Sequence, residues 1–200
     1  MTAAAAVLVD PAPTRALPPL PSAAALALER MTWRELDRVF LRGRELELDQ
    51  LVGWEFRGIN TRLFRSRGLP RVFGIKKFVK GFYRDEHGRA LGYNRAVRNN
   101  ALDGRFTIGD RRFGFFTVDP VDPTARDNAY LHAILLDYSK GDNPRRDPSR
   151  GLRDYLVQVE PGNPDLLLGK AYFAVGPLRV ASNFFILERH RVGLTDYARR

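Results

Sequence analysis

Four side chains within hydrophobic segments have the chemistry of acid–base catalysts, namely His132, Asp137, Tyr138 and Lys170. Each interrupts or borders a run of apolar residues, and burial in such a run would shift its pKa and let it hold or move a proton. These four are the catalytic candidates if the chain is an enzyme. The alternative for each is a structural position: a histidine hydrogen-bonded in the core, an aspartate that ends a strand, or a lysine that faces solvent.

Aromatic and aliphatic side chains of similar segments are candidates for the wall of a ligand cavity. In the segment 130–138, period-two alternation would place His132 on one strand face with Tyr130 and Ile134. The complete set of candidates is Phe56, Phe116, Tyr130, His132, Ile134, Tyr155, Tyr172 and Phe184. Only part of this set is expected to face inward.

Several other chemistries lack support in the sequence. The chain has no cysteine, which excludes disulfides, thiolate metal sites and a cysteine nucleophile. Its three histidines do not have the spacing of metal ligands, so no metal site is expected. There is no glycine-rich phosphate loop and no Gly-x-Ser-x-Gly motif, and we expect no cofactor.

Eight short segments rich in β-branched and aromatic residues predict a mainly β fold, an antiparallel up-and-down barrel of about eight strands behind a short N-terminal helix. Hairpin turns are expected at Gly109-Asp110, at 161–164 and at Gly176-Pro177. Several segments are apolar on both faces, so either the helix covers the outside of the barrel or the protein forms a homodimer. The expected strands are Leu51–Arg57, Val72–Tyr83, Arg105–Ile108, Arg112–Val118, Tyr130–Tyr138, Arg153–Val159, Leu166–Val175 and Leu178–Arg189.

The N-terminal part of the chain differs in composition from the rest. Residues 1–24 are rich in alanine and proline and predict a disordered leader. No basic residue precedes the apolar run of this leader, which argues against a secretory signal, although an organelle transit peptide stays an alternative. No apolar stretch reaches the roughly 20 residues of a membrane helix, so no membrane span is expected. The absence of cysteine favours a reducing compartment, and a cytoplasmic location is expected.

The remaining chain divides into three parts. Residues 25–50 predict a helical segment in which Thr32 and Glu35 have the spacing of a capping box. The barrel is assigned to residues 51–191, and residues 192–200 form a C-terminal tail.

The net charge of +10 is concentrated in one block. Nine basic residues occur between Arg57 and Arg84 with no acidic residue among them. We interpret this block as a solvated face, with a docking surface for an anionic partner as the alternative. The stretch 111–116 alternates arginine and phenylalanine as RNA-binding strands do, but the rest of that fold pattern is absent, so nucleic acid is not an expected partner.

A family resemblance rests on Gly53-Trp54 at the start of the first strand, the hairpins that follow, and Arg189 near the end of the last strand. This plan resembles the calycins, the group of lipocalins and fatty-acid-binding proteins, and is similar to bacterial GXWXG-type domains of unknown function. The resemblance implies that Trp54 forms the floor of one barrel end and that Arg189, with Arg191 as the alternative, packs across it. A guanidinium over an indole ring gains roughly 0.5–2 kcal/mol.

The expected function is the binding of a small hydrophobic or amphipathic molecule, either neutral or anionic, in the barrel cavity. The first alternative is a cofactor-independent isomerase, cyclase or dehydratase that uses the four catalytic candidates on an apolar substrate in the same cavity. The second alternative is a basic interaction module that docks an anionic partner.

Overall fold

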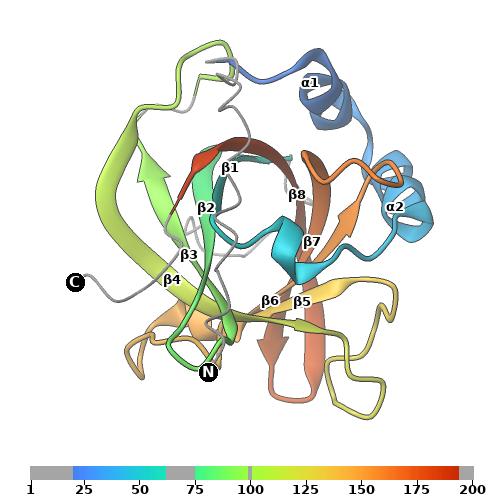
Figure 1. Cartoon of the computed structure of the whole chain (residues 1–200). Helices are drawn as coiled ribbons and strands as arrows, with labels where there is room; N and C mark the ends of the chain where they lie inside the picture. Colours follow the sequence, from blue (N-terminus) through green and yellow to red (C-terminus); the bar gives the residue numbers. More distant parts are fainter. Residues whose placement is uncertain (1–19, 62–74, 99–100, 194–200) are drawn as a thin grey trace, which may run out of the picture.

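Eight antiparallel strands close into a barrel in which each strand pairs with the next one in the sequence and β8 returns to β1 (Figure 1). The computed structural model describes residues 20–61, 75–98 and 101–193. The predicted mainly β, up-and-down antiparallel barrel is confirmed. Its strands are β1 (Trp54–Asn60), β2 (Lys77–Arg84), β3 (Ala90–Val97), β4 (Ile108–Pro120), β5 (Ile134–Asp137), β6 (Leu152–Gln158), β7 (Leu166–Val175) and β8 (Leu178–Val192).

Two short helices lie on the outside of the barrel beside β7 and β8 (Figure 1). Helix α1 spans Ala23–Arg30 and is capped by the Ser22 hydroxyl. Helix α2 spans Trp33–Arg42 and begins with the predicted capping box, in which Thr32 and Glu35 each accept a hydrogen bond from the backbone of the other. The chain forms two helices where the sequence predicts one, because Ser22 starts an additional helix in the alanine-rich stretch.

Alternation along the strands separates the apolar side chains into two layers. In β5, Ile134 and Leu136 belong to the cluster inside the barrel, whereas Leu135 belongs to a cluster outside it. The outer cluster includes Leu36 and Phe40 of α2. In the described part of the chain, the helices therefore cover strands that are apolar on both faces.

Strand β3 is absent from the sequence prediction, which leaves residues 84–104 as a loop. Gly92 and Asn94 are poor strand formers, and they hide the strand pattern. Around these residues the pairing of β3 with β4 shifts its register, between Gly92 and Asn94 and again between Arg95 and Val97. Such β-bulges admit residues that a regular ladder disfavours.

Strand β4 is predicted as two strands, and the hairpin turn predicted at Gly109-Asp110 is wrong. Both residues lie inside the single strand Ile108–Pro120, where the irregular pairing with β3 accommodates them. One missed strand and one divided strand compensate for each other, so the predicted number of eight agrees with the structure.

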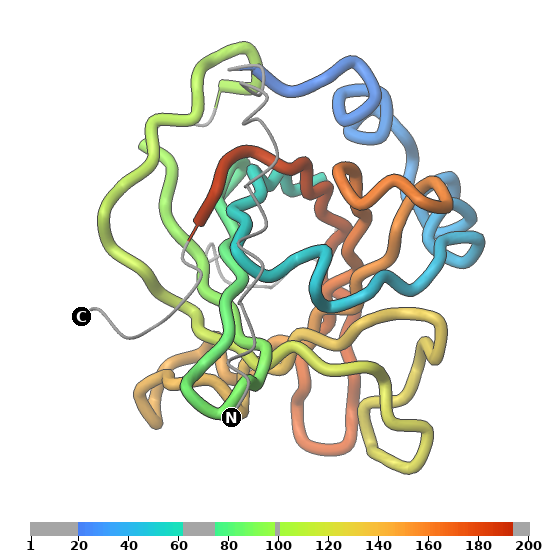
Figure 2. Tube along the Cα trace, viewed as in Figure 1, coloured from blue at the N-terminus to red at the C-terminus, as the bar shows by residue number. Residues whose placement is uncertain are grey.

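The chain crosses one end of the barrel on its way from α2 to β1 (Figure 2). This segment includes the 3-10 helix η1 (Leu48–Gln50), and its buried residues Leu46 and Leu51 join the inner apolar cluster. Apolar side chains therefore fill this end of the barrel, which we call the Trp54 end.

Trp54 and Arg189 contact each other at the Trp54 end. The Arg189 guanidinium carbon lies 4.4 Å from the centre of the Trp54 ring, and Trp54 is half-buried. Arg189 Nε donates to Asp165 Oδ1 at 2.6 Å, and its Nη2 donates to the Gln50 carbonyl at 2.9 Å. The arginine thus links the last strand to two connecting segments across this end.

Glycines on neighbouring strands make room for aromatic rings in the barrel interior. A Cβ atom on Gly169 would lie 2.0 Å from Phe185 Cζ, and one on Gly58 would lie 2.3 Å from Phe78 Cζ. Both distances are far below van der Waals contact, so each ring occupies the space that any larger residue would need.

We expect Gly169→Ala to lower the free energy of unfolding by about 1–3 kcal/mol, because the new methyl group must displace the Phe185 ring. Gly109→Ala is the matched control, since its nearest neighbour, the Ala96 carbonyl oxygen, would lie at an ordinary contact distance of 3.4 Å. Urea unfolding of both variants measures the difference, and equal effects would contradict this packing argument.

Candidate functional site

A cavity of about 250 Å³ lies inside the barrel at the end opposite Trp54. It is lined by Asn60 at the C-terminal end of β1, by residues near the start of β6 and by residues near the end of β7. Ile75 and Pro148, on its outer edge, are exposed, so the cavity extends to the protein surface. The larger apolar residues in its wall are Phe78, Phe113, Leu152, Phe173 and Phe185.

Four buried polar side chains form a hydrogen-bonded network in this cavity, which we call the Lys80 network. Lys80 Nζ donates to Asn94 Oδ1 at 3.1 Å, to Tyr138 Oη at 2.5 Å and to Asp154 Oδ2 at 3.2 Å. The Tyr138 hydroxyl donates to the same Asp154 oxygen at 3.0 Å. A cation, an anion, a phenol and an amide therefore meet in a cavity whose wall is mainly apolar.

The surroundings of Lys80 suit an ammonium ion. Its three hydrogen-bond acceptors match the three N–H donors of a charged lysine. Its Nζ also lies within 5.5 Å of the centres of four aromatic rings, those of Phe78, Phe116, Tyr138 and Phe185, whose faces attract cations. Burial lowers the pKa of Lys80, and the charge of Asp154 opposes that shift.

The Tyr138 hydroxyl stays protonated over a wide pH range. Burial raises the pKa of Tyr138 well above its usual value, and the neighbouring Asp154 carboxylate raises it further. The phenol can therefore donate its hydrogen bond to Asp154 at every pH near neutrality.

Strand register explains why these residues meet. Phe78, Lys80 and Phe82 alternate along β2 toward the inside of the barrel, and Lys80 is the register partner of Asn94 on β3. Lys80, Asn94 and Asp154 are not among the site residues that the sequence predicts. The alternation Phe-x-Lys-x-Phe in β2 carries a signal for Lys80, because two inward phenylalanines place the lysine between them on the same face.

The predicted site residues divide between the two faces of the barrel. Tyr138 lines the cavity. Phe56, Phe116 and Ile134 also face the interior, but they belong to its packed apolar cluster and not to the cavity wall. The other predicted ligand-binding residues lie on the outer face in the cluster that includes α2, or at its edge, and these are Tyr130, His132, Tyr155, Tyr172 and Phe184.

The outward position of Tyr130 and His132 has a local cause. Residues 130–133 do not continue β5, which begins at Ile134, so strand alternation does not apply to them. They belong instead to a connection that packs against α2, where His132 Nε2 lies 3.2 Å from the Phe40 carbonyl oxygen.

Lys170 anchors α2 to the outside of the barrel. Its Nζ donates to Asp37 Oδ1 at 2.6 Å and to Tyr130 Oη at 2.7 Å, and Tyr130 Oη lies 2.5 Å from Tyr172 Oη. Burial alone would lower the pKa of Lys170, but the hydrogen bonds with Asp37 and Tyr130 raise it above its usual value. Lys170 is therefore a protonated anchor, and the structure does not bring it together with Tyr138.

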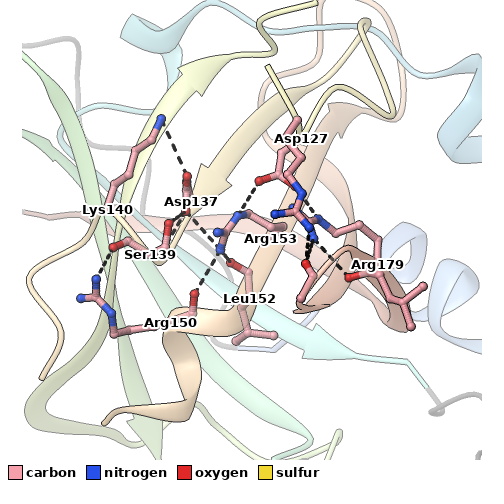
Figure 3. A network of polar contacts seen from close by, with 11 residues as sticks. Asp127, Asp137, Ser139, Lys140, Arg150, Leu152, Arg153 and Arg179 are labelled. Atoms are coloured by element: carbon pink, nitrogen blue, oxygen red, sulfur yellow. Dashed lines mark hydrogen bonds and ion pairs between the residues drawn. The ribbon is translucent and has the colours of Figure 1, made fainter. Parts of the chain in front are cut away.

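Asp137 also faces outward, in a network of charges on the barrel surface (Figure 3). It accepts hydrogen bonds from the Ser139 backbone and hydroxyl, and lies 3.2 Å from Arg153 Nη1. Asp127 links Arg153, at 2.9 Å, to Arg179, at 2.5 Å. This network connects the segment before β5 to β6 and β8, and none of these five charged or polar side chains lines the cavity.

The basic block from Arg57 to Arg84 is not one solvated face in its described part. Arg57 is 1% exposed and pairs with Glu188 at 2.7 Å, and Lys77 and Lys80 are buried. The more exposed residues of the block also have acidic partners: Lys76 pairs with Glu29, and Arg84 pairs with Asp49. Arg62, Arg65, Arg67 and Arg71 lie outside the described residues.

The described residues contain no cluster of three or more histidine, aspartate or glutamate side chains that could hold a metal ion. Among them there is also no helix long and apolar enough to cross a membrane. The sequence matches no protein-family model and no curated protein sequence. The geometry of the cavity is therefore the basis for the functional proposal.

We expect Tyr138→Phe to lower the free energy of unfolding by about 1–3 kcal/mol at pH 7, because Lys80 and Asp154 each lose a buried partner. Above pH 10 the difference in the free energy of unfolding between wild type and variant should narrow by up to about 1.4 kcal/mol per pH unit. The reason is that the pKa of Tyr138 is raised in the folded protein. In this pH range Tyr138 therefore ionises in the unfolded state but not in the folded state, which lowers the stability of the wild type. The variant has no hydroxyl at this position and does not lose stability in this way.

Urea unfolding of both proteins between pH 7 and pH 11 measures this gap. The other tyrosines are common to both proteins, so their ionisation cancels in the difference. A gap that stays constant up to pH 11 would contradict a buried, protonated Tyr138.

Proposed function

We propose that the protein binds a compact, largely apolar molecule in the cavity and holds the polar group of that molecule against the Lys80 network. The observation that carries the proposal is the combination of a mainly apolar wall with a buried, hydrogen-bonded network of polar side chains. Ligand sites commonly have this composition, because apolar walls supply affinity and a few fixed polar groups supply orientation.

The size of the cavity limits the ligand. Its volume of about 250 Å³ is just below the roughly 300–1,000 Å³ of typical ligand pockets. A single ring or a short branched chain fits this space, whereas a macrocycle such as a tetrapyrrole exceeds it. An extended chain would have to leave the cavity past Ile75 and Pro148.

The resemblance to calycins forms part of this proposal. An eight-stranded up-and-down barrel supports it, as does the contact between Trp54 and Arg189 at one end with the cavity at the other. Those features are the ones that the resemblance implies for a barrel that holds a small hydrophobic molecule.

Proton transfer in the same cavity is a second candidate function, and the position of Tyr138 favours it. The phenol lines the cavity, accepts hydrogen bonds from Lys80 and Asn94, and donates one to Asp154. A substrate that displaces one of the two donors could pass a proton to the phenol oxygen while the phenol passes its own proton to the carboxylate. Of the four predicted catalytic residues, only Tyr138 lines the cavity, and this position supports the second candidate. Analysis of the bound compound for chemical conversion separates an enzyme from a binding protein.

The binding proposal is tested by filling the cavity. Ala171 on β7 lines it, and Ala174, three residues later on the same strand, does not. We expect wild type and Ala174→Leu to bind a small apolar probe such as indole, and Ala171→Leu to lose this binding because its side chain occupies the same space. Chemical-shift titration by NMR reports the binding and also shows that each variant is folded.

Equal binding of indole by Ala171→Leu and Ala174→Leu would contradict a site in this cavity. The absence of stabilising or bound compounds across a broad panel of compact apolar molecules would contradict the proposed function as a whole.

A further inference from the structure

The charges at the buried end of the cavity already neutralise each other. The Lys80 and Asp154 side chains are 2% and 5% exposed, and their charged atoms lie 3.2 Å apart. The other acidic residue in the cavity wall is Asp147, a half-exposed residue whose carboxylate accepts the Ser149 backbone N–H. The described wall therefore carries one positive and two negative charges, although the whole chain has a net charge of +10.

Lys80 has no donor left for a ligand. Asn94, Tyr138 and Asp154 accept its three hydrogen bonds, and these three residues are themselves buried. A ligand carboxylate would have to break one of these bonds to reach the ammonium group. An anion in this cavity would thus lose its hydration without gaining a free counter-ion, which is strongly unfavourable.

Two other polar atoms of the wall residues have unused hydrogen-bonding capacity. The hydrogen bonds of Asp154 within the described residues all fall on Oδ2, which leaves Oδ1 as an acceptor. Ser149 also lines the cavity, and its Oγ has no hydrogen-bond partner among the described residues, but this atom is fully buried and does not reach the cavity surface. Asp154 Oδ1 is therefore the acceptor for a ligand group that donates a hydrogen bond, such as the hydroxyl of an alcohol.

We infer that the Lys80–Asp154 ion pair makes the cavity selective for uncharged ligands that carry a hydroxyl group, and that it excludes carboxylates. This inference rests on the proposed binding function and specifies the ligand class for the same site. It is the opposite of what the basic composition of the chain suggests, because the cavity lysine is fully paired.

The inference is tested with two probes of one skeleton, benzyl alcohol and benzoate, titrated into the full chain at pH 7. We expect the wild type to bind benzyl alcohol at least about tenfold more tightly than benzoate. Asp154→Asn removes the counter-ion of Lys80 at nearly constant volume. This variant should bind benzoate at least about tenfold more tightly than the wild type does, and should prefer it to benzyl alcohol.

The double variant Lys80→Met with Asp154→Asn is the matched control, since it removes both charges and should again discriminate against benzoate. If Asp154→Asn alone does not fold, the relative affinities of the wild type and of the neutral double variant for benzyl alcohol and benzoate decide the question. Wild type that binds benzoate as tightly as benzyl alcohol would overturn the inference while the binding function stands. Failure of both probes to bind any of the three proteins would contradict the inference together with the proposed function.

Discussion

The constraint on which the rest of the structure depends is the burial of a lysine inside a narrow barrel. A lone ammonium ion in an apolar interior is strongly destabilising, so its partners must be held in place from several strands at once. Lys80 on β2 obtains its acceptors from Asn94 on β3, from Tyr138 just after β5 and from Asp154 on β6. Closure of the barrel brings these strands together around the cation, and the network forms part of the cavity wall.

Two apolar layers support this polar centre. Inside, glycines such as Gly58 and Gly169 admit the rings of Phe78 and Phe185, and both rings also lie near Lys80 Nζ. Outside, α2 covers the strands and is fixed to them by Lys170, another buried lysine, which donates hydrogen bonds to Asp37 of α2 and to Tyr130. The two lysines thus have similar aromatic surroundings and different roles, because one lies on the inner face and the other on the outer face of the barrel.

The sequence predicted the barrel, the capping box of α2 and the boundaries of β7, because these depend on local spacing and on alternation within a segment. Of the site residues that it predicted, only Tyr138 lines the cavity. Whether Tyr155 or Asp154 faces inward depends on the register of β6 with its neighbours, and that register is a property of the closed sheet. Tyr130 and His132 were placed on a strand face although β5 starts only at Ile134. Lys80 was counted with the basic block because its neighbours in sequence are also basic.

The coupling between Lys80 and Asp154 is the most direct measurement of this account. Free energies of unfolding at pH 7 are needed for the wild type, Lys80→Met, Asp154→Asn and the double variant. Each single substitution leaves a buried charge or its partners unmatched and should lower stability by about 3–5 kcal/mol. The double variant should lose less than the sum of the two by at least about 1 kcal/mol, because the second substitution removes the charge that the first left unpaired. Losses that add to within about 0.5 kcal/mol would contradict a mutually dependent ion pair at the centre of the barrel.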